Sequence, residues 1–588
     1  MTESIRAGAG RHVGQIFFER AAELGERTFI KLQQGNRFEE ISWRDFAAIV
    51  QQALLGLVAL GLEPGDTVAI IGENCRQWLA ADLATLSGGF TNVAISPSLS
   101  DLMLLKILSH APCRAAFVQN AAGVGRLLNL KGQLPALSHI IAMEELDGDL
   151  PSTLSFEQLL KRGENLDVER LPAVLQAVHP NDLATIIYTS GSTGEPKGVM
   201  RTQDNLLANV TNGNAIVLSP PEELTANILS LNHLFGRFGF LKSAVTGRTT
   251  ALIEALETNL DLAVIQRLAP TGLAVVPRMM ERIWDSVLGQ DGNDDLWNQL
   301  ETLDDRKSGF GFTGTDGDRF DQLRAKLRIN VRDALGGRIK YIAYGGAAMP
   351  PRIMRFCELI GLPLIGSYGL TECGGVTLCG IGENRAGNLG KPFPNVQIRI
   401  ADDGEILVRG PTVSPGYYKN PEATREAFDD AGWFYTGDLG AIAADGSLRI
   451  TGRKKDVFNC ADGSNIYPSF IELQLENEPF IRQAVLLGDR RPFVAALLVP
   501  EREKIAESLK GDIASLSDNE IQAALWWQID RVNGRLERYE QIRKFTVMSA
   551  DFPSEVRSIN HFQKVKIDRD VVATLYQREI DAIYTMVV

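Results

Sequence analysis

A run of small and hydroxyl-bearing residues, YTSGSTGEPKG at 188–198, directly follows the apolar run Leu183–Ile187. Small residues after a strand let backbone N–H groups approach a polyphosphate, and hydroxyl groups add further donors. The run is not a Walker A loop, because Lys197 is followed by Gly198 and not by Ser or Thr. The composition predicts a phosphate-binding loop, with a flexible connector as the alternative. The candidate phosphate contacts are Thr189, Ser190, Gly191, Ser192, Thr193, Gly194 and Lys197.

Three further motifs follow in the chain: SYGLTECGG at 367–375, GWFYTGDLG at 432–440 and ITGRKKD at 450–456. Together with the first run, in this order, they resemble the adenylate-forming superfamily of acyl-CoA synthetases, luciferases and peptide-synthetase adenylation domains. Within that superfamily the chain is most similar to long-chain fatty acyl-CoA synthetases. The segments that carry this similarity are LGGRIKYIAYGGAAMP, NPEATREAFDDAGWF and GDRRPFVAALLVPE. The resemblance covers nearly the whole chain.

The resemblance implies a two-step reaction. A carboxylate attacks the α-phosphate of MgATP to give an acyl adenylate and pyrophosphate, and a thiol, usually that of coenzyme A, then displaces AMP. Because the first step brings one anion against another, catalysis should depend on positioning and charge neutralisation. The expected acid is a medium- or long-chain fatty acid. The alternatives are an aromatic acid as substrate and an acyl carrier protein as acceptor.

The nucleotide site is expected from the middle motifs. By resemblance, Thr371 and Glu372 serve the α-phosphate and Mg²⁺, an ion for which one carboxylate beside phosphate oxygens is sufficient. Asp438 is expected to accept hydrogen bonds from both ribose hydroxyls, since an ionised carboxylate offers two acceptor oxygens; taken alone, it would be a turn residue. Arg453 is expected to help bind the ribose at the domain junction. The adenine face is expected from Gly345, Gly346, Ala347, Tyr368 and Gly369.

The acid site is expected around His233, in SLNHLFGRFGF, where the family places an aromatic or His side chain beside the acyl carboxylate. A purely structural His is the alternative. The segment GLAVVP at 272–277 resembles the strand that walls the acyl tunnel, although it could equally be plain core. An apolar tunnel can bind a long chain without polar contacts, because each buried methylene is worth about 0.8 kcal/mol.

The C-terminal segment departs from the family in two places. Relatives carry a Thr-Pro-Thr-Leu-Lys-type segment that delivers the catalytic lysine, whereas this chain has NHFQK, so Lys564 is the candidate and Lys566 the fallback. A solvated surface lysine is the alternative. In DVFNCADGSNIYP at 456–468, Ser464 takes a position usually held by a cation, which puts the thiol acceptor in doubt. Lys455 matches the hinge about which the C-terminal domain rotates between half-reactions.

Alternating helical patterns and short apolar runs must position these motifs. Helices are expected at 101–110 and 351–360 and strands at 67–71 and 115–118, which predicts an α/β fold with a mostly parallel sheet. Hairpins are expected at 397–410 and 440–452, a surface loop at 308–318, and helices at 519–537 and 570–582. We expect a large N-terminal domain of layered α/β subdomains at 1–452 and a small mobile α+β domain at 453–588.

Composition and charge indicate which partners and which cellular location to expect. The chain has 588 residues, 45% of them hydrophobic, and a formal net charge of −13, which argues against nucleic acid as a partner. The six cysteines form no CxxC pair, and no signal peptide or long apolar run is present, so a cytoplasmic protein is expected. The composition is compatible with peripheral membrane contact, and it does not indicate an oligomeric state. An alternative outside the enzymes is a nucleotide-binding protein that has lost catalysis. Only the two departures from the family pattern in the C-terminal segment favour it.

Overall fold

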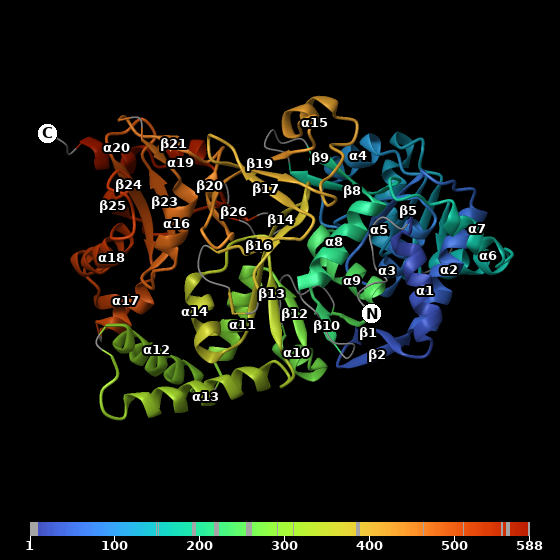
Figure 1. The fold of residues 1–588 in the computed structure, drawn as a ribbon. Coiled ribbons are helices and arrows are strands. Elements are labelled where there is room, and N and C mark those ends of the chain that lie inside the picture. Colours follow the sequence, from blue (N-terminus) through green and yellow to red (C-terminus); the bar gives the residue numbers. More distant parts are fainter. Residues whose placement is uncertain are drawn as a thin grey trace.

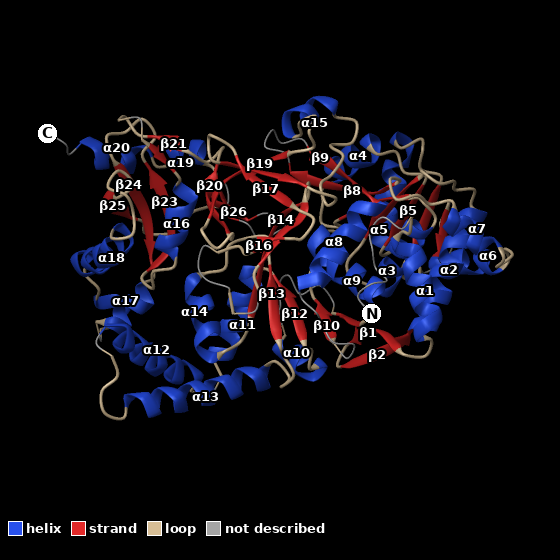
Figure 2. Cartoon of the chain, in the orientation of Figure 1, coloured by secondary structure: helices blue, strands red, loops and turns tan. Residues whose placement is uncertain are grey.

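The computed structural model describes residues 10–146, 148, 150, 152–190, 196–216, 223–253, 261–290, 292–309, 311–380, 382–383, 388–462, 464–509, 511–553, 557–559 and 565–585. Helices and strands alternate through most of this chain, and the last quarter forms a separate body at one end of the molecule (Figure 1). The colouring by element type shows helices covering the sheets of both parts (Figure 2). The predicted α/β fold, with a large N-terminal and a smaller C-terminal domain, is confirmed.

The first sheet carries the phosphate motif. Its seven strands run in the order β7-β6-β5-β3-β4-β8-β9, and every neighbouring pair is parallel except β8 with β9. β3 and β5 coincide with the predicted strands and are buried along their whole length, as strands covered on both faces should be. The strands are β3 (Thr67–Ile71), β4 (Thr91–Ile95), β5 (Ala115–Val118), β6 (His139–Ala142), β7 (Thr153–Ser155), β8 (Leu183–Ser190) and β9 (Pro196–Thr202).

The second sheet has nine strands in the order β16-β15-β14-β13-β12-β10-β11-β1-β2. Neighbours from β14 to β1 are parallel, whereas β2, β15 and β16 are antiparallel additions at the two edges. The strands are β1 (Thr28–Gln34), β2 (Arg37–Ser42), β10 (Leu224–Asn227), β11 (Thr249–Leu252), β12 (Gly272–Val275), β13 (Tyr341–Tyr344), β14 (Leu364–Leu370), β15 (Gly374–Leu378) and β16 (Lys391–Pro392).

Helices cover both sheets, and those at 101–110 and 351–360 lie where the sequence predicted them. They are α1 (Val13–Leu24), α2 (Trp43–Ala59), α3 (Arg76–Ser87), α4 (Asp101–His110), α5 (Ala121–Leu130), α6 (Phe156–Glu164), α7 (Arg170–Gln176), α8 (Gln203–Ile216), α9 (Leu234–Thr246), α10 (Leu262–Leu268), α11 (Pro277–Leu288), α12 (Asn293–Gly309), α13 (Asp316–Ala334), α14 (Pro351–Ile360) and α15 (Pro421–Ala427). A short 3₁₀ turn at Lys131–Gln133 follows α5.

The Gly-rich segment 308–318 is a shorter loop than predicted. α12 extends to Gly309, and α13 already begins at Asp316. The Asp316 carboxylate accepts hydrogen bonds from the backbone N–H and the hydroxyl of Thr313, and it lies where the helix dipole favours a negative charge. The two helices run along one side of the molecule towards the C-terminal body (Figure 1).

A four-stranded sheet joins the two domains. Both predicted hairpins are confirmed, because β17 pairs with β18 and β19 with β20 in antiparallel register. The strands are β17 (Gln397–Ile400), β18 (Glu405–Arg409), β19 (Phe434–Ile442) and β20 (Leu448–Arg453). Asp438 in β19 lies directly opposite Arg453 in β20, so the sheet itself brings two predicted site residues together.

The C-terminal part is built on the three-stranded sheet β23-β24-β25. The predicted helix at 519–537 is present as α18 but already ends at Asn533. The predicted helix at 570–582 is interrupted at Tyr576, whose ring packs against Phe552. The elements are β21 (Phe458–Asn459), β22 (Asn465–Ile466), α16 (Pro468–Glu476), β23 (Ile481–Leu487), β24 (Val494–Pro500), α17 (Arg502–Ser508), a 3₁₀ turn (Ile513–Ser515), α18 (Asp518–Asn533), β25 (Ile542–Val547), β26 (Arg557–Ile559), β27 (Val565–Ile567), α19 (Arg569–Leu575) and α20 (Gln577–Thr585).

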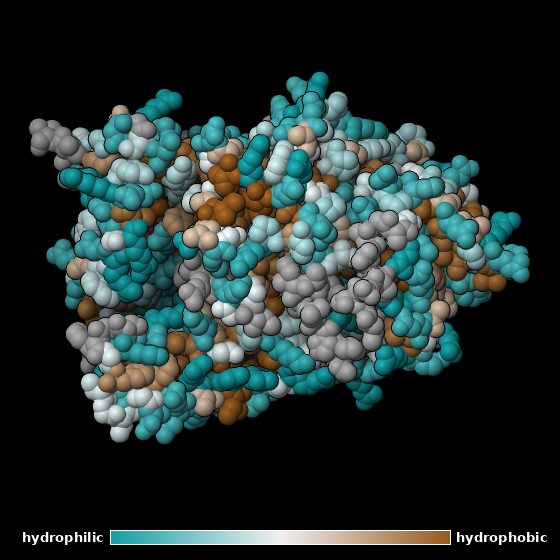
Figure 3. All heavy atoms as spheres, viewed as in Figure 1, coloured by the Kyte–Doolittle hydropathy of each residue, from teal (hydrophilic) through white to brown (hydrophobic). Residues whose placement is uncertain are grey.

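Polar side chains cover much of the face in Figure 3, with apolar side chains gathered in smaller areas between them. Among the described residues, no helix is both long and apolar enough to cross a membrane. All six cysteines carry free thiols, and five of them are buried.

Candidate active site

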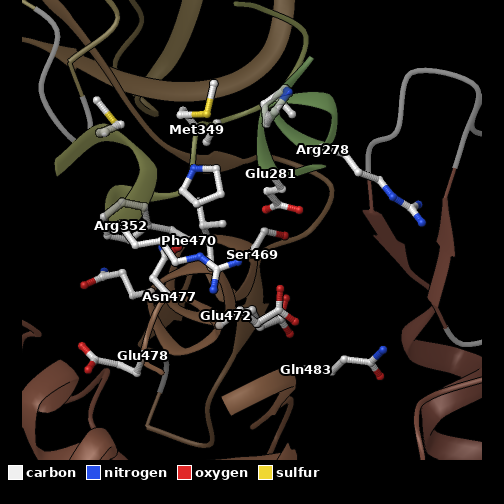
Figure 4. Close-up of a pocket in the computed structure, with 18 of the residues that line it drawn as sticks. Arg278, Glu281, Met349, Arg352, Ser469, Phe470, Glu472, Asn477, Glu478 and Gln483 are labelled. Carbon is white, nitrogen blue, oxygen red and sulfur yellow. The ribbon is translucent and has the colours of Figure 1, made fainter. Parts of the chain in front are cut away.

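A cleft of about 3020 Å³ lies between the N-terminal sheets and the C-terminal domain. Part of its wall is visible in Figure 4, where Met349 and Arg352 face Ser469 and Phe470 of α16. Four separate motifs of the sequence reach this one space. The predicted site residues that line it are Thr189, Lys197, Gly346, Ala347, Tyr368, Gly369, Glu372, Asp438, Arg453 and Lys455.

The carboxylate of Asp438 is held from two sides. Its Oδ2 accepts a hydrogen bond of 2.8 Å from the Tyr368 hydroxyl, and its Oδ1 lies 2.9 Å from Nε of Arg453. The backbone N–H of Asp438 donates to Oγ1 of Thr436 at 3.1 Å, which fixes the turn. Burial and the neighbouring carboxylate raise the pKa of Tyr368, so this phenol stays protonated and remains a donor. Each carboxylate oxygen of Asp438 is thus held by one partner, and the residue lines the cleft.

The turn before Asp438 depends on a carboxylate that the sequence analysis missed. Glu405 Oε1 accepts from the backbone N–H of Gly437 at 2.8 Å, and its Oε2 lies 2.8 Å from Nζ of Lys454. Lys454 also pairs with Asp403 at 2.6 Å, and its backbone N–H donates to Gly437 O at 2.9 Å. The residue directly before the expected hinge at Lys455 is therefore tied to the N-terminal domain.

The carboxylate of Glu372 is held by a second residue that the sequence analysis missed. The Tyr417 hydroxyl donates to Glu372 Oε1 at 3.1 Å, and the Lys197 ammonium lies 4.9 Å from the centre of the Tyr417 ring. Burial raises the pKa of Glu372, and the Tyr417 hydrogen bond and the charges of Lys197 and Arg201 oppose this shift. The only signal for Tyr417 is its place just before NPEATREAFDDAGWF.

The charges on the cleft wall fit a magnesium ion that is bound mainly by the phosphates of a nucleotide. Among the described residues, no group of three or more His, Cys, Asp and Glu side chains could hold a metal ion by itself. Mg²⁺ prefers few carboxylates together with phosphate oxygens and water. Glu372 on the cleft wall, beside the cation of Lys197, meets that preference.

His233 lies outside the large cleft, in a smaller pocket of about 40 Å³. It caps α9, and its backbone carbonyl accepts from the N–H of Arg237 at 3.0 Å. Val276, the residue after β12, lines the same pocket, so the predicted tunnel-wall segment is partly sheet core and partly pocket wall. Phe235 also lines this pocket and lies beside Gly345, because a Cβ on Gly345 would lie only 3.4 Å from its ring.

Some predicted residues are placed differently or lie outside the described part of the chain. Thr371 and Gly345 are described, but the cleft lining does not include them. Gly346 lines it with φ = 85°, a conformation that favours glycine. Ser190 is the last residue of β8 and Lys566 lies in β27, but the structure describes only the backbone of these two residues. The predicted residues outside the described chain are Gly191, Ser192, Thr193, Gly194 and Lys564.

The start of α19 is anchored inside the C-terminal domain. Arg569, just after β27, pairs with the buried carboxylate of Glu472 in α16 at 2.9 Å and donates to Leu486 O at 2.9 Å. Ser464 sits in a tight turn, because its backbone N–H donates to Asp462 Oδ1 at 2.9 Å and its carbonyl accepts from Cys460 N at 3.0 Å. Ser464 is therefore held by contacts with Asp462 and Cys460 of the same segment.

Comparison with known proteins agrees with this geometry. Residues 17–418 match the AMP-binding enzyme family, and residues 455–587 match the AMP-binding enzyme C-terminal domain. The chain is 33% identical over 566 residues to the long-chain-fatty-acid–CoA ligase FadD15 of Mycobacterium bovis, covering 93% of this chain and 92% of that one. It is 28% identical over 623 residues to the long-chain-fatty-acid–CoA ligase ACSBG1 of Mus musculus, covering 97% and 85%.

Solved structures share the fold. The adenylation domain of the carboxylate reductase GR01_22995 from Mycobacterium chelonae superposes with a TM-score of 0.74 at 21% identity, covering 98% of this chain and 92% of that one. The anthranilate CoA ligase AuaEII, solved with anthranoyl-AMP, gives a TM-score of 0.73 at 18% identity, covering 97% and 98%. The chain therefore belongs to the AMP-binding enzyme family, the adenylate-forming enzymes.

Proposed function

We propose that this protein activates a medium- or long-chain fatty acid with MgATP and transfers the acyl group to the thiol of coenzyme A. The observation that carries the proposal is the meeting of two held carboxylates, Asp438 and Glu372, with the cation of Lys197 around one cleft. The fatty acid is supported by relatives that are named long-chain-fatty-acid–CoA ligases and align over nearly the whole chain.

In the first step, a carboxylate oxygen of the acid bonds to the α-phosphorus, and the bond from that phosphorus to the oxygen bridging the α- and β-phosphates breaks. Pyrophosphate leaves with the electron pair. Asp438 orients the ribose, while Lys197 and Glu372 act on the phosphates, Glu372 through the Mg²⁺ that accompanies ATP. Fixed charges aimed at a developing charge need no reorganisation during the reaction, which is the main source of their effect.

In the second step, the thiolate sulfur attacks the acyl carbon and AMP leaves. We propose that the chain divides at 452/453, that Lys564 serves the first step, and that the C-terminal domain turns about Lys455 between the two steps. The tie between Lys454 and Glu405 supports a hinge that begins only after residue 454.

An acyl carrier protein as acceptor is the second candidate. The observation that favours it is the ordered turn at Ser464, which replaces the cation that relatives carry in that segment. The reaction needs only small molecules and a carrier thiol, so a cytoplasmic location with at most peripheral membrane contact fits both candidates.

The test is pyrophosphate release with ATP and a panel of fatty and aromatic acids, with and without coenzyme A, followed by mass spectrometry of the products. We expect release that depends on a fatty acid and a thioester that appears only with coenzyme A. Release without thioester formation until an acyl carrier protein is added would favour the second candidate. Absence of release with every acid would overturn the proposal.

A further inference from the structure

A fully buried arginine lies behind the phosphate end of the cleft, and the mechanism above does not use it. Arg201 occupies the interior of β9, the strand that follows the phosphate motif, and none of its surface is exposed. It stands directly opposite Thr185 of β8 in the strand register. The strand that follows the phosphate motif thus carries a fully buried positive charge.

The Arg201 guanidinium reaches the metal-site segment through backbone oxygens only. Its Nη1 lies 3.4 Å from the carbonyl oxygens of both Thr371 and Glu372. The Glu372 carbonyl also accepts a 2.7 Å hydrogen bond from the N–H of Ser414. Among the described residues, no side chain accepts from Nε or Nη2 of Arg201.

Such an arrangement is unfavourable for stability. A guanidinium keeps its charge at neutral pH, so Arg201 is a fully buried cation. A buried charge without an ion-pair partner is destabilising, and a well-packed apolar side chain at the same position is often neutral or stabilising. Packing of the fold therefore does not explain why a cation stands at this position.

The position of the cation suggests what it does. Two carbonyls held on the buried side leave the Glu372 side chain directed to the cleft, where Tyr417 meets it. We infer that Arg201 is a positioning residue for adenylation, which fixes the Thr371–Glu372 backbone and places a permanent positive charge behind the bound triphosphate. This inference rests on the proposed function.

The variant Arg201→Met tests the inference, because methionine is unbranched and apolar and fits a buried strand position. We expect Arg201→Met to unfold at the same temperature as the wild type or higher. Its kcat for pyrophosphate release should fall at least tenfold and the heat of MgATP binding should change, while the KM for the acid stays the same. Conversion of supplied acyl adenylate and coenzyme A to thioester should continue at the wild-type rate.

The chain offers a matched control in Arg237, which is equally buried but pairs with the carboxylate of Asp82 through a 2.8 Å hydrogen bond from Nε. Arg237→Met leaves that carboxylate unpaired in the core and should lower the unfolding temperature clearly. The same substitution at two buried arginines thus separates a charge that supports the fold from one that supports the reaction.

Two results would overturn the inference. One is an Arg201→Met variant that unfolds earlier, or fails to fold, and loses both half-reactions together, since the role would then be structural. The other is a stable variant with normal adenylation. Failure of the proposed function is distinct, because it would appear in the wild type as absence of pyrophosphate release with every acid.

Discussion

Tyr417 donates its hydroxyl hydrogen to Oε1 of Glu372 at 3.1 Å, and this contact joins residues that lie far apart in the sequence. The Lys197 ammonium lies over the same tyrosine ring. The loop that carries Tyr417 is tied to β9 by backbone hydrogen bonds from Tyr418 N to Gly198 O and from Met200 N to Gly416 O. One tyrosine thus contacts both the carboxylate and the cation that we propose act on the phosphates.

Tyr417→Phe should therefore impair adenylation while keeping the fold. The ring and its contact with Lys197 remain, but Glu372 loses its donor and samples other rotamers. We expect kcat for pyrophosphate release to fall about tenfold, equivalent to ~1.4 kcal/mol of transition-state stabilisation. Steady-state kinetics at saturating ATP would measure this effect.

Tyr418→Phe is the matched control, because the Tyr418 ring packs against His110, whereas the hydroxyl that donates to Glu372 is that of Tyr417. It removes a hydroxyl from the same loop and should leave kcat nearly unchanged. Equal losses in both variants would mean that the loop, and not the bond to Glu372, accounts for the effect.

Many of the residues that line the cleft could be listed from the sequence because they stand inside continuous motifs. Asp438 and Arg453 are two of them, and the register of β19 and β20 explains why they meet. Tyr417, Glu405 and Arg201 were not found, because their roles arise from contacts between segments that only the folded chain brings together. No local pattern distinguishes such residues from ordinary strand or loop positions.

The secondary structure also divides into elements that local sequence predicts and elements that it does not. Regular strands such as β3 and β5 follow from composition, since strands covered on both faces are predominantly apolar. The break at Tyr576 has no signal in the local pattern, and in the structure the Tyr576 ring packs against Phe552. Helical periodicity continues across that break and so predicts one helix in place of two.

Asp438→Ala should raise the apparent KM for ATP. In the structure both carboxylate oxygens already have a partner, Tyr368 on one and Arg453 on the other. Removing the carboxylate therefore leaves the ribose hydroxyls without an acceptor. It also leaves the buried Tyr368 hydroxyl and the half-buried Arg453 guanidinium without their hydrogen-bond acceptor. Calorimetric titration with ATP would measure the loss, and an unchanged binding curve would refute the ribose assignment.

The buried side chain of His12 should make the folded protein less stable at pH values below neutrality. The side chain is fully buried, and its Nε2 lies 2.9 Å from the Leu175 carbonyl. Burial lowers the pKa of His12 below its usual value of 6.5, so the unfolded chain binds a proton more readily than the folded one. The stabilisation is present above the unfolded pKa and is lost as the pH falls through the folded pKa.

Comparison of wild type with His12→Gln would test this effect, because glutamine can donate to the same carbonyl and does not titrate. Between about pH 8 and about pH 5.5, the melting temperature of the wild type should fall further than that of the variant. Parallel pH profiles of the two proteins would show that another group is responsible.

Lys564→Ala should separate the two half-reactions. If the lysine lies over the carboxylate and the α-phosphate only during adenylation, its charge offsets the repulsion that builds up as anion meets anion. Once the C-terminal domain has turned about Lys455, Lys564 should have left the site. The variant should then form acyl adenylate very slowly, yet convert supplied acyl adenylate and coenzyme A to thioester at close to the normal rate.

Lys566→Ala is the internal control for Lys564→Ala. Residues two apart along a strand point to the same face, and only one ammonium can occupy the anion site. Lys566 pairs with Ser558 in the short sheet of β26 and β27, which holds it in a regular strand. A selective adenylation defect in Lys566→Ala, and none in Lys564→Ala, would move the catalytic role to Lys566. Equal loss of both half-reactions in both variants would contradict a separate role of this segment in adenylation, because a charge needed only against the α-phosphate cannot slow the attack of a thiol on the acyl carbon.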